Sequence, residues 1–74
     1  MNGKGYDRCR LGLNIRRRRQ MLHLTQAELA ARVQCSAGMI SQVEKGKQDL
    51  TVERFFGLCC ALECPMQELL QGVE

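Results

Sequence analysis

With 74 residues the chain has room for one small domain, and a domain of this size buries only about 60% of its unfolded surface. No apolar run approaches the roughly 20 residues that cross a bilayer, and the first residues lack the apolar core of a secretory signal, so we expect a soluble, cytoplasmic protein without a membrane partner. The net charge of +3 is unevenly spread, because residues 1–47 hold ten Lys or Arg against three Asp or Glu, and residues 48–74 hold one against five. This asymmetry favours a polyanionic partner on one side, with a plain mixture of solvated charges as the alternative.

Five cysteines are an odd number for a disulfide framework, and three of them crowd one expected helix, at positions 59, 60 and 64. No export signal supports an oxidising compartment, and the one histidine, His23, lies far from these cysteines in sequence. We therefore interpret the cysteines as small buried thiols and expect no metal and no cofactor. Cys9 is the exception, since it is expected in a mobile arm where adventitious oxidation can reach it.

Almost the whole chain is expected to be helical, because it has one proline, few aromatic residues and no stretch of alternating β-branched residues. Residues 1–10 contain two glycines and several polar residues, which predicts a flexible N-terminal arm. Residues 11–74 are expected to form one compact, all-α domain of five short helices.

The first helix is predicted at about 11–22, with an apolar face of Leu11, Ile15 and Leu22. Arg18 and Arg19 lie at the centre and at the flank of that face. A charge close to a core is costly unless it is paired, so one of these two arginines should have a specific acidic partner.

The second and third helices are marked by their caps. Thr25 and Glu28 have the spacing of a capping box, which predicts a helix beginning at Thr25 with Leu29, Ala30 and Val33 inward. Ser36 is suited to cap the next helix, which carries Ile40 and Val43 inward and ends at Gly46.

The fourth helix is predicted to begin near Thr51, which can serve as its N-cap. Its expected apolar side consists of Val52, Phe55, Phe56, Cys59 and Leu62. Pro65 suits the first turn of a last short helix that carries Met66, Leu69 and Leu70.

Two short helices joined by three or four residues have the plan of a helix-turn-helix, whose second helix fits the major groove of DNA. Taken alone this pattern is a weak signal, because any helical hairpin shares it. Beyond the two helices, several segments have the residues and the spacing of one known family of helix-turn-helix proteins. These segments are Leu24-Thr25-Gln26-Ala27-Glu28-Leu29-Ala30, Ser36, Ile40-Ser41, Glu44-Lys45-Gly46-Lys47, Thr51-Val52-Glu53 and Ala61-Leu62. Over roughly residues 11–70 the chain thus resembles the lambda-repressor-like (Cro and 434-repressor type) helix-turn-helix family.

This resemblance implies an ion pair between Arg19 and Glu44, the glutamate that closes the recognition helix. Arg18 would then point toward solvent or a DNA phosphate. Gln26 matches the glutamine that holds a phosphate at a helix start, where amides and the helix dipole favour an anion. The full set of phosphate contacts implied is Thr25, Gln26, Arg18, Lys45, Lys47 and Gln48.

The recognition helix is implied to span about 36–45, and its base-reading positions are Ser36, Ala37, Gly38, Ser41 and Gln42. Gln42 can pair with adenine through two hydrogen bonds, and Ala37 can contact a thymine methyl group. The alternative for Ser41 and Gln42 is plain solvent-facing polarity, and for Ala37 and Gly38 it is simply close approach to the groove. The sparse polar groups suggest that specificity depends partly on DNA shape or on the arm.

The sequence departs from the family at three turns. Gln34 and His23 stand where glycine is common, and Leu50 stands where proline is common. A left-handed conformation at Gln34 would cost conformational energy.

The predicted function is a sequence-specific transcriptional regulator that binds a palindromic double-stranded DNA operator as a homodimer, similar to small phage repressors and restriction-modification controller proteins. Candidate dimer contacts, some of which must serve the core instead, are Phe55, Phe56, Leu58, Met66 and Leu69. The alternative is an antitoxin that autoregulates its operon and binds a toxin. An enzyme is not expected, since the chain has no catalytic triad spacing and no phosphate-binding glycine loop.

Overall fold

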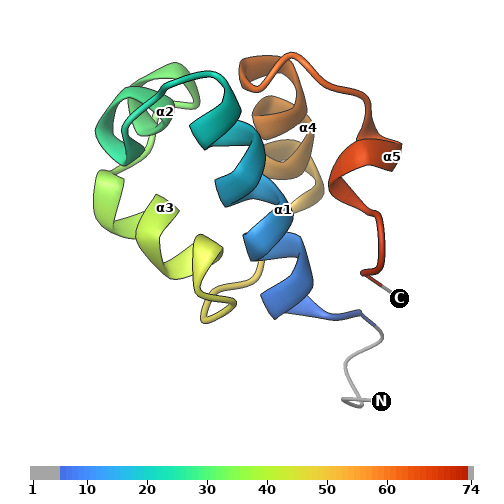
Figure 1. Cartoon of the computed structure of the whole chain (residues 1–74). Helices are drawn as coiled ribbons and strands as arrows, with labels where there is room; N and C mark the ends of the chain where they lie inside the picture. The colour runs from blue at the N-terminus through green and yellow to red at the C-terminus, as the bar shows by residue number, and fades with distance from the viewer. Residues whose placement is uncertain (1–5, 74) are drawn as a thin grey trace.

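The computed structural model describes residues 6–73, which form five helices. They are α1 (Arg8–Met21), α2 (Gln26–Arg32), α3 (Ala37–Glu44), α4 (Val52–Ala61) and α5 (Met66–Leu69). α1 lies at the centre, with α2 and α3 on one side and α4 and α5 on the other (Figure 1). α1 packs against α3 and α5, α2 packs against α3, and α4 packs against α5. The predicted all-α, five-helix fold is confirmed.

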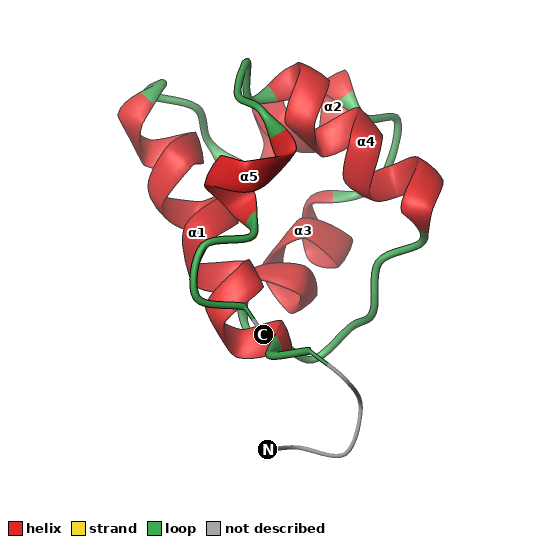
Figure 2. Cartoon of the chain, turned by 90° about the vertical axis from the view of Figure 1, so that its right-hand side faces the viewer, coloured by secondary structure: helices red, strands yellow, loops and turns green. Residues whose placement is uncertain are grey.

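The predicted starts of the three middle helices are also confirmed. Thr25 Oγ1 accepts a hydrogen bond from the amide of Glu28, and the Glu28 carboxylate accepts one from the amide of Thr25, which completes the capping box. Ser36 and Thr51 cap α3 and α4, each accepting from the amide three residues further on. A cap of this kind stabilises a helix by about 1 kcal/mol. All of the helices appear in red in Figure 2, joined by short loops.

α1 begins earlier than predicted. Asp7 accepts a hydrogen bond from the amide of Arg10, and this cap starts the helix at Arg8 rather than near Leu11. Of the expected arm, residues 1–5 lie outside the described part of the chain, whereas residues 8–10 form the first turn of α1. The amide of Asp7 donates to the carbonyl of Val73 at 2.6 Å, which binds the start of α1 to the last described residue.

One core connects all five helices. Its fully buried large side chains are Ile15, Leu29, Ile40, Leu58, Leu62 and Leu69. Two apolar residues expected on the inner side of α4 lie outside instead, because Val52 is 71% and Phe56 47% exposed. Leu58 takes the core position, since the face that meets the core runs through residues 55, 58, 59 and 62 at helical spacing.

All five cysteines are free thiols, but they are not uniformly buried. Cys59 lies in the core, whereas Cys9 and Cys60 are exposed, so the interpretation as buried thiols is wrong for Cys60. Burial raises the pKa of the Cys59 and Cys64 thiols, which keeps both protonated at neutral pH. Within residues 6–73 no group of three His, Cys, Asp or Glu is placed to hold a metal ion, and none of the helices has the length and apolar character to traverse a bilayer.

Candidate nucleic-acid interface

α2 and α3 form a helix-turn-helix whose turn comprises residues 33–36. The amide of Cys35 donates to the carbonyl of Ala30 at 3.0 Å, which closes the turn. Gln34 adopts a φ of 58°, a left-handed conformation that costs a non-glycine residue about 1 kcal/mol. Because α2 packs directly on α3, this turn fixes the direction in which α3 presents its outer face.

The outer face of α3 carries the residues expected to read bases. Ser36, Gly38 and Gln42 are exposed, and Ala37 and Ser41 are half-buried. Ser36 Oγ accepts the amide of Met39 at 3.1 Å, so its hydroxyl is engaged in capping. Gln42 is the one long polar side chain of this set.

Gly38 has no packing role inside the protein. A Cβ at this position would meet only Ser36 Oγ, at the ordinary contact distance of 3.9 Å. Glycine within a helix costs about 1 kcal/mol relative to alanine. Its effect is therefore on the outside, where the missing side chain lets another surface approach α3 closely.

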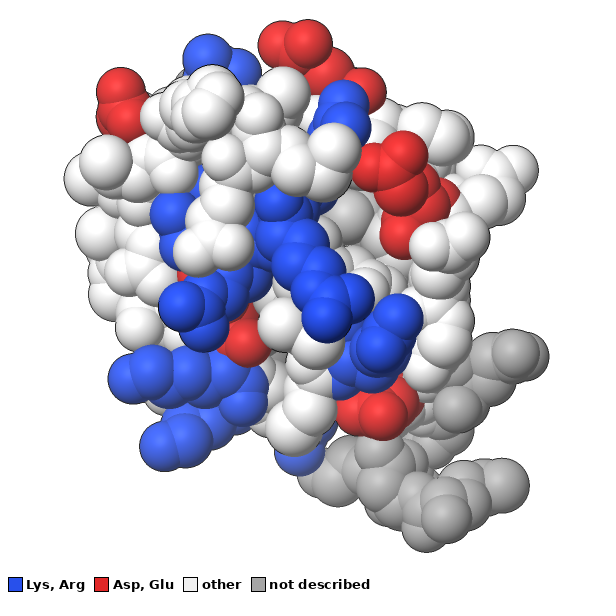
Figure 3. Space-filling model, viewed as in Figure 1, with Lys and Arg blue, Asp and Glu red and all other residues white. Residues whose placement is uncertain are grey.

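Lys45, Lys47 and Gln48 are exposed just beyond α3. Gly46 turns the chain there with a φ of 73°, and the amide of Lys47 donates to the carbonyl of Gln42 at 2.9 Å. Neither lysine takes part in an ion pair among the described residues. Figure 3 shows Lys and Arg side chains gathered over α1 and the end of α3.

The start of the chain braces this loop. The Tyr6 hydroxyl donates to Asp49 Oδ1 at 2.9 Å, and Arg8 Nη1 donates to the same oxygen at 3.2 Å. Burial and the hydrogen bond to Asp49 raise the pKa of Tyr6, so it remains a protonated donor. Gly46 packs so closely on Cys9 that a Cβ would lie 2.7 Å from Cys9 Sγ. The segment from Tyr6 to Cys9 therefore holds the loop that carries the two lysines.

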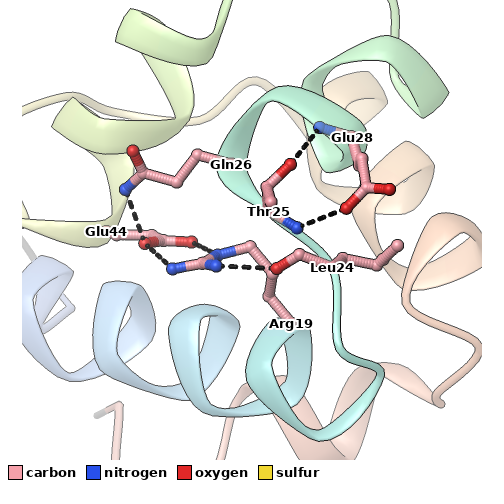
Figure 4. Close-up of polar contacts among 6 residues, drawn as sticks. All are labelled: Arg19, Leu24, Thr25, Gln26, Glu28 and Glu44. Carbon is pink, nitrogen blue, oxygen red and sulfur yellow. Dashed lines mark hydrogen bonds and ion pairs between the residues drawn. The ribbon is translucent and has the colours of Figure 1, made fainter.

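The ion pair that the resemblance implied is present (Figure 4). Arg19 Nε and Nη2 donate to the two oxygens of Glu44 at 2.7 and 3.1 Å, and Arg19 Nη1 donates to the carbonyl of Leu24 at 2.8 Å. The side chains are well buried, with exposed fractions of 11% for Arg19 and 3% for Glu44. The pair ties the end of α1 to the end of α3.

Gln26 extends this network, because its Nε2 donates to Glu44 Oε1 at 3.0 Å. An ionised carboxylate only accepts hydrogen bonds, so it can face the amino group of Gln26 and not its carbonyl oxygen. The Glu44 carboxylate thus fixes which way the Gln26 amide is turned, and one amide N–H remains for a further acceptor.

Arg18 lies elsewhere. Its Nε and Nη2 donate to the carbonyls of Leu62 and Glu63 at 2.8 and 2.9 Å, and Nε is 3.6 Å from the Glu68 carboxylate. The expectation that Arg18 points toward solvent or phosphate is wrong, because the carbonyls at the end of α4 lack partners within the helix and attract a cation.

Arg16 is an exposed cation that the sequence analysis did not single out. It follows Gly12 by four residues and precedes Arg19 by three, so all three share one side of α1. That side meets the end of α3, since a Cβ on Gly12 would collide with the carbonyls of Val43 and Glu44. Helical spacing from Arg19 is the signal that could have identified it.

The comparisons with known proteins agree with this geometry. The model of the helix-turn-helix family matches residues 15–69. The chain is similar to the P22 c2 repressor protein, solved in complex with synthetic operator 9T, at 37% identity over 84% of this chain and 94% of that one, with a TM-score of 0.78. It is also similar to the clp gene regulator ClgR from C. glutamicum, at 30% identity over 86% of this chain and 83% of that one, with a TM-score of 0.82.

The restriction-modification controller protein C.AhdI from Aeromonas hydrophila has the same fold, with a TM-score of 0.79 at 24% identity over 82% of this chain and 92% of that one. The sequence has no match among curated proteins. The family match covers most of the chain and coincides with the helix-turn-helix of α2 and α3. The chain belongs to the helix-turn-helix family, in its lambda-repressor-like branch.

Proposed function

We propose that this chain binds double-stranded DNA sequence-specifically through α3 in the major groove and regulates transcription as a homodimer. The observation that carries the proposal is the exposed outer face of α3 with exposed cations near its end, Lys45 and Lys47 just beyond it and Arg16 on the side of α1 that meets it. A helix fits the major groove, and flanking cations neutralise phosphates. A similar protein, the P22 c2 repressor, was solved on an operator.

In this proposal the residues divide into base readers and phosphate anchors. Gln42 pairs with adenine, Ala37 contacts a thymine methyl group, and Gly38 permits close approach. Six side chains hold phosphates in this proposal: Arg16, Thr25, Gln26, Lys45, Lys47 and Gln48. Since the reading side chains are few, DNA shape supplies part of the specificity.

We propose a dimer because one recognition helix contacts only a few base pairs. Two copies about 34 Å apart, one helical turn of DNA, read both halves of a palindrome. Of the candidate contacts, Leu58 and Leu69 are buried in the core, with exposed fractions of 0% and 1%. Phe55, Phe56 and Met66 remain, and Phe56 and Met66 are large exposed apolar side chains of α4 and α5.

Selection of bound duplexes from a random DNA pool tests the proposal. We expect enrichment of an inverted repeat with half-sites about 10 base pairs apart, and sedimentation of the complex should give two chains per duplex. A pool that stays random after repeated selection would contradict the proposal of sequence-specific binding. One chain per duplex would overturn the homodimer alone.

The antitoxin alternative uses the same exposed apolar surface for a different purpose. A toxin would cover Phe56 and Met66 in place of a second copy. Purification of the chain from its native cells distinguishes the two, because a stoichiometric second protein supports the antitoxin and a DNA-bound homodimer contradicts it.

A further inference from the structure

We propose that a groove between α2 and α4 is a binding site for a small anionic molecule. Arg32, Val33 and Gln34 form one wall, and α4 with its cap forms the other. The volume is about 520 Å³, which lies within the range of small-molecule sites, about 300–1,000 Å³. The groove plays no part in the proposed reading of DNA by the outer face of α3.

Arg54 is the cation of the α4 wall. It is half-buried in the α4 wall of the groove, and the one hydrogen bond of its side chain among the described residues runs from Nη1 to Met39 Sδ at 3.2 Å. A thioether is a weak acceptor, whereas a guanidinium offers five N–H donors. No described carboxylate lies within ion-pair distance of Arg54. A half-buried cation without a counter-ion favours an anionic ligand.

The rest of the lining leaves the groove net positive. Arg32, on the facing wall, donates to the carbonyl of Ala61 at 3.2 Å and lies 4.0 Å from the Glu63 carboxylate. Glu53 is the one acidic residue of the lining. Two guanidinium groups and one carboxylate suit a ligand with a single carboxylate or phosphate group.

Gly57 is the glycine of the groove lining. It lies in the interior of α4 and lines the groove. A Cβ there would meet only Val33 Cγ1, at the ordinary contact distance of 3.9 Å, so packing does not require glycine. Glycine inside a helix lowers its stability relative to alanine. The glycine therefore keeps open a space that the fold itself does not use.

The test follows backbone amide NMR signals while inorganic phosphate replaces chloride at constant pH and ionic strength, without DNA. We expect saturable shifts at Gln34 and Gly57, and a loss of affinity of about tenfold or more in Arg54→Gln, which removes a charge-assisted contact. Arg17→Gln is the matched control, because it removes one exposed arginine of α1 outside the groove. Equal weakening in both variants, or shifts that never saturate, would overturn the site.

A second variant separates binding from folding. Gly57→Leu fills the groove and improves helix propensity, so it should raise the unfolding temperature while abolishing the phosphate response. Gly57→Ala makes the same change with a smaller side chain, and should weaken the response while the protein remains folded. A phosphate response that survives Gly57→Leu contradicts the proposal. Since no DNA is present, these results stand apart from the proposed function.

Discussion

The buried carboxylate of Glu44 accepts three side-chain hydrogen bonds, two from Arg19 and one from Gln26. The donors come from α1 and from the first turn of α2, and the acceptor is the last residue of α3. α3 is thereby tied to both of its neighbours, α1 and α2, through one residue. The same carboxylate orients a proposed phosphate contact, so fold and function share it.

Glu44→Ala should lower the free energy of unfolding by about 3 kcal/mol, because it leaves the Arg19 guanidinium buried without its counter-charge. Urea unfolding followed by circular dichroism measures the loss. Arg8→Ala is the control, since it breaks a more exposed ion pair with Asp49 and should cost less than about 1 kcal/mol. Equal losses in the two variants would contradict the special role of the buried pair.

Gln42→Ala and Lys47→Ala should weaken DNA binding in different ways. Loss of a base contact costs about 1–3 kcal/mol on the preferred operator and little on random duplexes, whereas loss of a phosphate contact weakens both and reduces the salt dependence. Fluorescence anisotropy on selected and random duplexes at several salt concentrations separates the two patterns. If both variants lose affinity equally on both duplexes, the division into readers and anchors is wrong.

Not every residue role can be predicted from the sequence. The Arg19–Glu44 pair followed from the family resemblance, because both positions belong to the matching pattern. Arg18 could not be placed, since its partners are the carbonyls of Leu62 and Glu63, more than forty positions away in sequence. A backbone carbonyl has no sequence signature, so its partner is known only once α4 has been positioned.

At the scale of elements, three helices are followed, two residues after their last residue, by a left-handed residue that is not glycine: His23, Gln34 and Glu63. The values of φ are 58°, 58° and 55°, in the region where L-residues are strained. These turns keep their conformation because the helices packed around them hold it in place despite the strain. The first two are positions where the resemblance expected glycine.

Gln34→Gly should therefore raise the free energy of unfolding by about 1 kcal/mol, since glycine adopts this conformation without strain. Thermal unfolding provides the measurement. Gly46→Ala tests the converse, because its φ is 73° and a Cβ would lie 2.7 Å from Cys9 Cα. That variant should be destabilised, and stabilisation by Gly46→Ala or destabilisation by Gln34→Gly would contradict the argument.

The starts of α2, α3 and α4 could be predicted because each depends on a cap and an amide three residues away. The inner face of α4 was harder. Val52 and Phe56 are apolar but lie outside, since apolar residues also occur on surfaces and composition alone does not give the rotation of a helix. The start of α1 at Arg8 was missed because Asp7 follows a glycine-containing segment that favoured an arm.

At the scale of the whole molecule, the exposed apolar side chains of α4 and α5 stand out. Val52, Phe56, Met66 and Leu70 are each more than 40% exposed. In the proposed homodimer a second copy covers part of this surface.

Phe56→Asp should convert the proposed dimer into a monomer, because a carboxylate cannot be buried against an apolar partner without a large cost. Since Phe56 is 47% exposed, the fold should tolerate the change. Analytical ultracentrifugation gives the mass, and Met21→Asp is the control because Met21 is 65% exposed at the end of α1. A dimer that persists in Phe56→Asp would show that another surface holds the two copies together.

The hydrogen bond between the amide of Asp7 and the carbonyl of Val73 makes the described chain a nearly closed ring. A short linker can therefore join residue 73 to residue 6 without stretching either end, and Tyr6 keeps its hydrogen bond to Asp49. If the ring is then opened at Gln48, an exposed loop residue between α3 and α4, every helix remains uncut. The order of the helices along the chain is thus separable from their arrangement in space, and a circularly permuted protein should retain the same helix-turn-helix.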